Sequence, residues 1–139
     1  MNNHDVNIGS ALLKFKFRDE DGEIISSFRI NPADVKLAKR CTEVSSYFED
    51  LHNRIPENAT IDDVIKFNDE LEEKICYLLG YDAKQSLFGQ MSATTIMPDG
   101  NLFAVHIVDN VVQAVGPEVK KRQENMAQAV AKHTAKYVK

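Results

Sequence analysis

Hydrophobic and polar residues alternate in two short runs near the start of the chain. In the first run, apolar side chains on one side of a strand alternate with lysines on the other: Leu13, Lys14, Phe15, Lys16 and Phe17. A second alternation ends at Ile30, and the Asp21-Gly22 pair between the runs is typical of a hairpin turn. The pattern predicts a β-hairpin over about 11–30. An isolated hairpin is marginally stable in water, so we expect its aromatic face to pack on helices or its edge to pair with another chain.

After the hairpin, apolar residues recur at steps of four and three, which predicts a helix over about 32–54. Asn31 is suited to cap the free amides at its start, and Pro32 has the backbone angle of a first helical turn. The apolar seam comprises Leu37, Cys41, Val44, Phe48, Leu51 and Ile55. Such a seam can pair two chains in a coiled coil, but fewer than three heptads is more typical of a helix in the core of one chain.

A second amphipathic helix is predicted over about 60–79, with Thr60 at its start and Gly80 at its end. Its apolar stripe comprises Ile61, Val64, Ile65, Asn68, Leu71, Ile75, Leu78 and Leu79. The other face is acidic and carries Asp62, Asp63, Asp69, Glu70, Glu72 and Glu73. This acidic face is either a solvated helix surface or a docking site for a basic segment.

The rest of the chain predicts further helices separated by an irregular segment. A short helix over 82–88 is capped by Asp82, and the loop that follows contains the apolar residues Met91, Ile96 and Met97. Such residues either pack over the core or form a surface that a partner covers. The valines and isoleucines of 101–115 also suit a strand, but the length of the segment and the Gly116-Pro117 pair after it favour a helix. A last helix is predicted over 118–137.

Length and composition place these elements in one α+β domain that is mainly α, with four or five helices. The chain has 139 residues, of which 43% are hydrophobic, so it can bury a core of its own. We expect a disordered segment over 1–10, a single globular domain over 11–117, and a basic helix or mobile tail over 118–139. The basic residues of this tail include Lys120, Lys121, Arg122, Lys132 and Lys136.

Charge is unevenly distributed between the domain and the tail. Residues 118–139 contain six Lys or Arg and two Glu, a net charge of +4, so residues 1–117 carry −8 of the total of −4. The Lys120-Lys121-Arg122 run permits contact with a nucleic-acid backbone. The acidic domain and the lack of aromatic residues among these basic ones disfavour nucleic acid as a partner, and a basic tail that pairs with the acidic helix of its own or another chain accounts for the same charges.

Motifs for catalysis or cofactor binding are absent from the sequence. The four histidines are scattered and lack the spacing of a helical zinc site, and the glycines form no phosphate-binding loop. We therefore predict a protein that is not an enzyme and that binds no metal or cofactor. Cys41 and Cys76 lie in apolar helical patterns and are expected to be buried free thiols. No secretory signal and no membrane-spanning segment is found, which predicts a cytoplasmic location.

Several motifs resemble the tail assembly chaperones of long-tailed bacteriophages and prophages. They are Phe15-Lys16-Phe17-Arg18-Asp19-Glu20-Asp21-Gly22, Ser27-Phe28-Arg29-Ile30-Asn31-Pro32-Ala33-Asp34, Leu79-Gly80-Tyr81-Asp82, Leu87-Phe88-Gly89 and Val115-Gly116-Pro117. The resemblance implies a small, mostly helical, non-catalytic protein of the host cytoplasm that is absent from the finished particle. Its partner would be the tape measure protein, which it keeps soluble while the tail tube assembles. The tail tube protein and a second copy of the chain are further candidate partners.

A chaperone of this kind needs apolar side chains that a client can cover. We expect the groove to be formed by Leu87, Phe88, Met91, Phe103, Ile107 and Val111. The alternative is that these residues belong to the core. A second functional hypothesis is a small DNA-associated or regulatory phage protein that uses the basic C-terminal segment.

Overall fold

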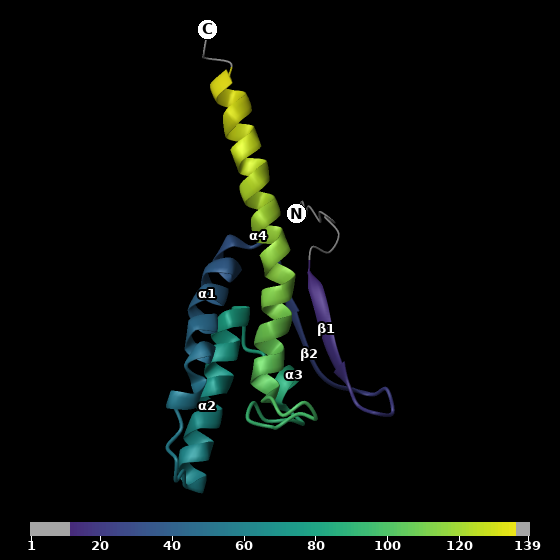
Figure 1. Ribbon diagram of the computed structural model, residues 1–139. Helices are drawn as coiled ribbons and strands as arrows, with labels where there is room; N and C mark the ends of the chain where they lie inside the picture. The colour runs from purple at the N-terminus through teal and green to yellow at the C-terminus, as the bar shows by residue number, and fades with distance from the viewer. Residues whose placement is uncertain (1–11, 136–139) are drawn as a thin grey trace, which may run out of the picture.

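The computed structural model describes residues 12–135, which contain a two-stranded hairpin, four α-helices, one short 3₁₀ helix and the segments that connect them (Figure 1). The elements are β1 (Leu13–Arg18), β2 (Ile24–Ile30), α1 (Val35–Glu49), η1 (Leu51–Asn53), α2 (Ile61–Leu79), α3 (Lys84–Phe88) and α4 (Phe103–Ala135). The fold is α+β and mainly α, as predicted. The segment 1–10, predicted to be disordered, lies outside the described residues.

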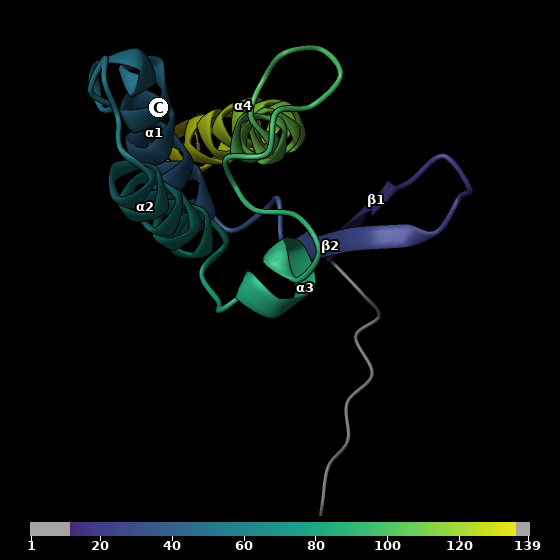
Figure 2. The same ribbon diagram turned by 90° about the horizontal axis from the view of Figure 1, so that it is seen from below.

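Helix α4 lies at the centre of the fold. Helices α1 and α2 pack on one side of it, and the hairpin lies on the other side with α3 against β2 (Figures 1 and 2). The core fills the space between these elements. Its fully buried residues include Leu71, Ile75 and Leu78 of α2, Leu87 of α3, and Phe103, Ile107 and Val111 of α4.

The hairpin packs its aromatic face on the helices, as expected from its alternating pattern. Phe15 lies opposite Phe28, and their rings stack with centroids 4.7 Å apart. Phe17 contacts the ring of Phe103 edge-on, with centroids 5.1 Å apart. An isolated two-stranded hairpin is marginally stable, and the packing of these rings against the helices stabilises this one.

Helix α1 begins later and ends earlier than predicted. Its cap is Asp34, whose Oδ1 accepts a hydrogen bond of 3.0 Å from the backbone N–H of Lys36. Asn31 instead accepts one of 3.1 Å from the N–H of Ala33, within a turn that precedes the helix. Both residue types favour caps, and the one nearer the apolar seam begins the helix. The helix ends at Glu49, and the 3₁₀ helix η1 occupies part of the predicted remainder.

Helix α2 has the predicted ends but a different buried stripe. Thr60 and Asp63 form a reciprocal capping box, and Gly80 ends the helix in the left-handed conformation at φ 80°. Phe67 is buried, whereas the predicted Ile61 and Ile65 are 74% and 52% exposed. Phe67 lies four residues before the buried Leu71 and shares its face, which turns the stripe away from the two isoleucines.

The predicted helices 101–115 and 118–137 are one continuous helix, α4, so the predicted stop at Gly116-Pro117 is wrong. Proline removes a backbone donor and crowds the preceding turn, but both residues are exposed, where water can solvate the freed carbonyl. Gly116 also has no Cβ to clash with the proline ring. The second half of α4 therefore extends beyond α1 and the hairpin (Figure 1).

Candidate partner-binding groove

The groove predicted around Phe103 is not on the surface. Leu87, Phe103, Ile107 and Val111 are 0% exposed, and only Phe88 and Met91 among the predicted residues are half-buried. The rings of Phe17 and Phe88 both contact Phe103 edge-on, so the hairpin and α3 cover it from outside. The four buried residues belong to the core, and their predicted role as an accessible surface is corrected.

An open apolar groove lies elsewhere, beside the 3₁₀ helix η1. We call it the η1 groove, and its volume is about 550 Å³. It is lined by Phe48, Leu51, His52, Ile55, Val64, Phe67, Thr94, Ile96 and Leu102. One wall comes from the end of α1 and the segment after it, the second from the start of α2, and the third from the loop before α4.

The loop wall of the η1 groove is attached to α2 through Asn68. The Oδ1 atom of Asn68 accepts hydrogen bonds from the backbone N–H of Thr94 at 3.1 Å and from its hydroxyl at 3.0 Å. The amide of Asn68 also donates to Glu72, one turn along α2. Burial raises the pKa of Glu72, although this hydrogen bond acts in the opposite direction. The polar Asn68, predicted as part of an apolar stripe, thus positions a loop.

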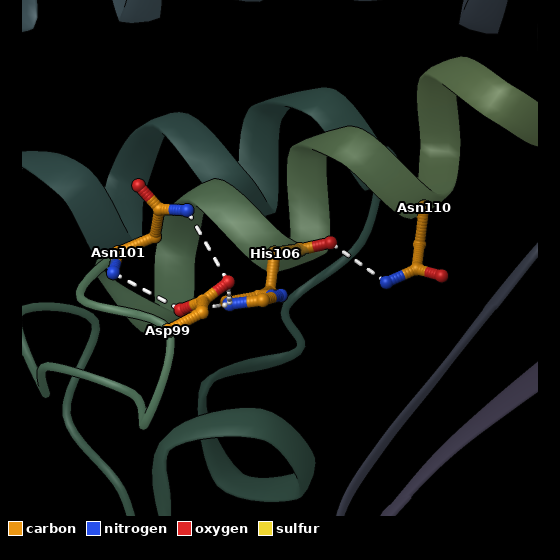
Figure 3. A network of polar contacts seen from close by, with 4 residues as sticks. All are labelled: Asp99, Asn101, His106 and Asn110. Atoms are coloured by element: carbon orange, nitrogen blue, oxygen red, sulfur yellow. Dashed lines mark hydrogen bonds and ion pairs between the residues drawn. The ribbon is translucent and has the colours of Figure 1, made fainter.

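The same loop is attached to the start of α4 by a network of polar contacts (Figure 3). Nε2 of His106 lies 2.8 Å from Oδ2 of Asp99, and the backbone N–H of Asn101 donates to Oδ1 of Asp99 at 3.0 Å. The contact with His106 and the hydrogen bonds from the backbone and side-chain N–H groups of Asn101 lower the pKa of Asp99 to about 2. Backbone bonds from Phe103 N–H to Thr95 C=O and from Ala104 N–H to Ala93 C=O complete the attachment.

Two of the isoleucines that line the η1 groove are exposed. Ile96 is 71% exposed at the loop wall, and Ile55 is 38% exposed. Large aliphatic side chains exposed close to one another are typical of a surface that a partner covers. Ile96 was recognisable in the sequence as an apolar residue in a loop, but the sequence did not show that residues of α1 and α2 lie beside it in one groove.

The predicted basic residues lie mainly along the extended half of α4. Lys120, Lys121 and Lys132 are exposed and Arg122 is half-buried, while Lys136 lies outside the described residues. Met126, on the same part of the helix, is 61% exposed. The structure does not bring this basic segment onto the acidic face of α2 in the same chain, because α4 extends away from the end of the α1–α2 pair (Figure 1).

Metal clusters and membrane-spanning helices are not found among the residues that the structure describes. Within this part of the chain, no group of three or more His, Cys, Asp or Glu side chains is arranged to hold a metal ion. Over the same residues, no helix has both the length and the apolar character needed to cross a bilayer. Cys41 is a buried free thiol as predicted, whereas Cys76 is only half-buried.

Comparisons with protein-family models, with curated proteins and with solved structures find no significant match to this chain.

Proposed function

We propose that the chain is a non-catalytic tail assembly chaperone that binds an apolar helical segment of the tape measure protein in the η1 groove. The observation that carries this proposal is an apolar groove of about 550 Å³ that is open to solvent, with Ile96 71% exposed at its wall. The resemblance of several sequence motifs to tail assembly chaperones indicates the class of client. In this proposal the chain acts in the host cytoplasm and is not part of the finished particle.

The size and lining of the groove support a client in helical form. Apolar binding sites commonly have volumes of about 300–1,000 Å³, and an amphipathic helix binds such grooves through side chains on one face. Burying one Leu, Ile or Phe side chain contributes about 1.5–3 kcal/mol. A few client side chains seated beside Phe48, Val64 and Ile96 therefore give useful affinity, while the open shape allows release when the tail tube assembles.

The acidic surface beside the groove supports a solubilising role. Asp62, Asp69 and Glu73 are exposed on α2, and residues 1–117 carry a net charge of −8. A complex that covers an apolar client segment with a strongly charged body resists aggregation, because like-charged complexes repel one another.

Co-expression with the tape measure protein tests the proposal. The Ile96→Asp variant places a charge in the groove at an exposed position, so the domain stays folded while the client loses an apolar contact. We expect the soluble fraction of tape measure protein to fall several-fold. Val35→Asp is the matched control, because Val35 is 59% exposed but lies outside the groove. Equal solubility with Ile96→Asp and with the wild type, both folded by circular dichroism, would contradict the proposal.

A DNA-associated or regulatory role is a second candidate, favoured by one observation. Lys120, Lys121 and Lys132 are exposed on a part of α4 that extends from the body, where a phosphate backbone could reach them (Figure 1). A gel shift with duplex DNA that weakens steeply with salt, and that is lost when Lys120, Lys121 and Arg122 are changed to Gln, would favour this role. Absence of a shift at low salt would reject it.

A further inference from the structure

Basic residues on the outer face of the hairpin lie opposite one another and, among the described residues, have no acidic partner. Lys14 of β1 lies directly opposite Arg29 of β2, and Lys16 lies opposite Ser27. Like charges in directly opposite positions destabilise an antiparallel pair. Among the described residues, none of these three cationic side chains forms an ion pair with a carboxylate. The arrangement has an unbalanced positive charge that a bound anion would neutralise.

These residues line a pocket of about 180 Å³, which we call the hairpin pocket. Its lining comprises Lys14, Lys16, Ser27, Phe28, Arg29, Tyr81 and Ser86. The two lysines come from β1, Ser27 and Arg29 from β2, and the other hydroxyls from α3 and the segment just before it. Basic and hydroxyl side chains therefore surround the pocket from three separate parts of the chain, and the Ser86 hydroxyl already donates to the backbone carbonyl of Ala83 at 3.2 Å.

Tyr81 orders the side of the pocket that contains Arg29. The guanidinium carbon of Arg29 lies 4.3 Å from the centroid of the Tyr81 ring, a cation–π contact that restricts its orientation. The backbone N–H of Arg29 donates to the hydroxyl oxygen of Tyr81 at 3.0 Å. Because that oxygen acts as an acceptor, the hydroxyl proton stays available to a ligand. The hydroxyl of Ser27 forms no hydrogen bond with another described residue.

We propose that the hairpin pocket binds a compact oxyanion of the phosphate type. Arg and Lys side chains are the usual partners of phosphoryl oxygens, and hydroxyl donors complete such sites. Donors that approach from several directions suit a tetrahedral oxyanion better than a planar carboxylate. A volume of about 180 Å³ is sufficient for a phosphate group. The net charge of −8 on residues 1–117 also disfavours a long polyanion over a small one.

This site is independent of the η1 groove, because the hairpin and the α1–α2 pair lie on opposite sides of α4 (Figure 2). A ligand in the hairpin pocket would join β1, β2 and the α3 region. Since it binds the folded chain only, it would raise the thermal midpoint as its concentration increases.

Titration of the full chain with inorganic phosphate, followed by amide NMR, tests the site. Sodium chloride at matched ionic strength is the salt control, and acetate is the carboxylate control. We expect saturable, millimolar phosphate binding with shifts at residues 14, 16, 27, 29 and 81. In a variant combining Lys14→Gln and Arg29→Gln, affinity should fall at least about tenfold, because two charge-assisted hydrogen bonds are lost. Lys132→Gln, on the exposed part of α4, should leave it unchanged.

Each other result counts against the proposal. Shifts that are linear in phosphate, that chloride reproduces, or that persist in the Lys14 and Arg29 variant would show that no specific site exists. If acetate binds as tightly as phosphate, the pocket is a general anion site without the proposed preference for a tetrahedral oxyanion. Saturable binding of duplex DNA without binding of inorganic phosphate would identify the hairpin as a nucleic-acid surface instead. All variants change exposed residues, and circular dichroism checks that they stay folded.

Discussion

The buried cluster around Phe103 and the η1 groove are both apolar, and the loop before α4 contacts Phe103 and also lines the groove. Phe103 is covered by rings from β1 and α3, whereas Ile96, seven residues earlier, remains 71% exposed. Hydrophobic character alone does not distinguish a core from a binding surface. What distinguishes them is whether another element of the chain packs over the residues.

Substitution in the buried cluster should have the largest effect on stability. Phe103→Ala removes a fully buried ring from between Phe17 and Phe88, and we expect the free energy of unfolding to fall by about 3–5 kcal/mol. Urea denaturation of both proteins measures the difference. Ile96→Ala is the matched comparison and should change stability by no more than about 0.5 kcal/mol. Similar effects at the two positions would break the distinction between core and groove.

Removal of the loop attachment should have an intermediate effect. Asn68→Ala leaves the half-buried backbone N–H and hydroxyl of Thr94 without their acceptor, which should cost about 1–3 kcal/mol. Amide hydrogen exchange at Thr94 should accelerate with it. Asn110→Ala is the control, since among the described residues the amide of Asn110 donates only to the carbonyl of His106, in its own helix. If exchange at Thr94 is the same in both variants, Asn68 does not position the groove wall.

The elements themselves were largely predictable from the sequence. The hairpin and the limits of α2 follow from local signals, namely the Asp21-Gly22 turn, the Thr60 cap and the left-handed Gly80. The continuity of α4 was not predictable from Pro117, because its effect depends on whether the surrounding backbone is solvated.

The location of the accessible apolar surface was not predictable for a different reason. Periodicity shows that a helix face is apolar, but not how far the neighbouring elements extend over it. The side chain of Phe103 is covered by residues distant in sequence, such as Phe17, and the η1 groove combines three separate segments. Local patterns contain no information on these long-range contacts.

Acidification should have the smallest effect on the loop. The pKa of Asp99 is lowered from 3.8 to about 2 in the folded chain. Its contacts therefore stabilise the fold at pH values above the unfolded-state pKa, and this contribution is lost as the pH falls from about 4 to about 2. The difference in thermal midpoint between the wild type and Asp99→Asn should be small at neutral pH and should vanish towards pH 2. Both side chains are solvent-accessible, so added salt should reduce the difference.

Asp109→Asn serves as the control for the acid experiment, because Asp109 forms no ion pair within the described part of the chain. A pH-dependent difference of the same size in this variant would show that general charge, and not the contact between Asp99 and His106, causes the effect.

Isoleucine methyl NMR with an apolar helical fragment of the tape measure protein tests the central claim most directly. The probes differ in position: Ile55 and Ile96 line the η1 groove, Ile24 is 45% exposed on the hairpin, and Ile107 is buried in the core. The η1 groove proposal predicts that the fragment shifts the methyl signals of Ile55 and Ile96 and leaves that of Ile24 unchanged. Saturable binding of the fragment that shifts Ile24 or Ile107 and leaves Ile55 and Ile96 unchanged would contradict it.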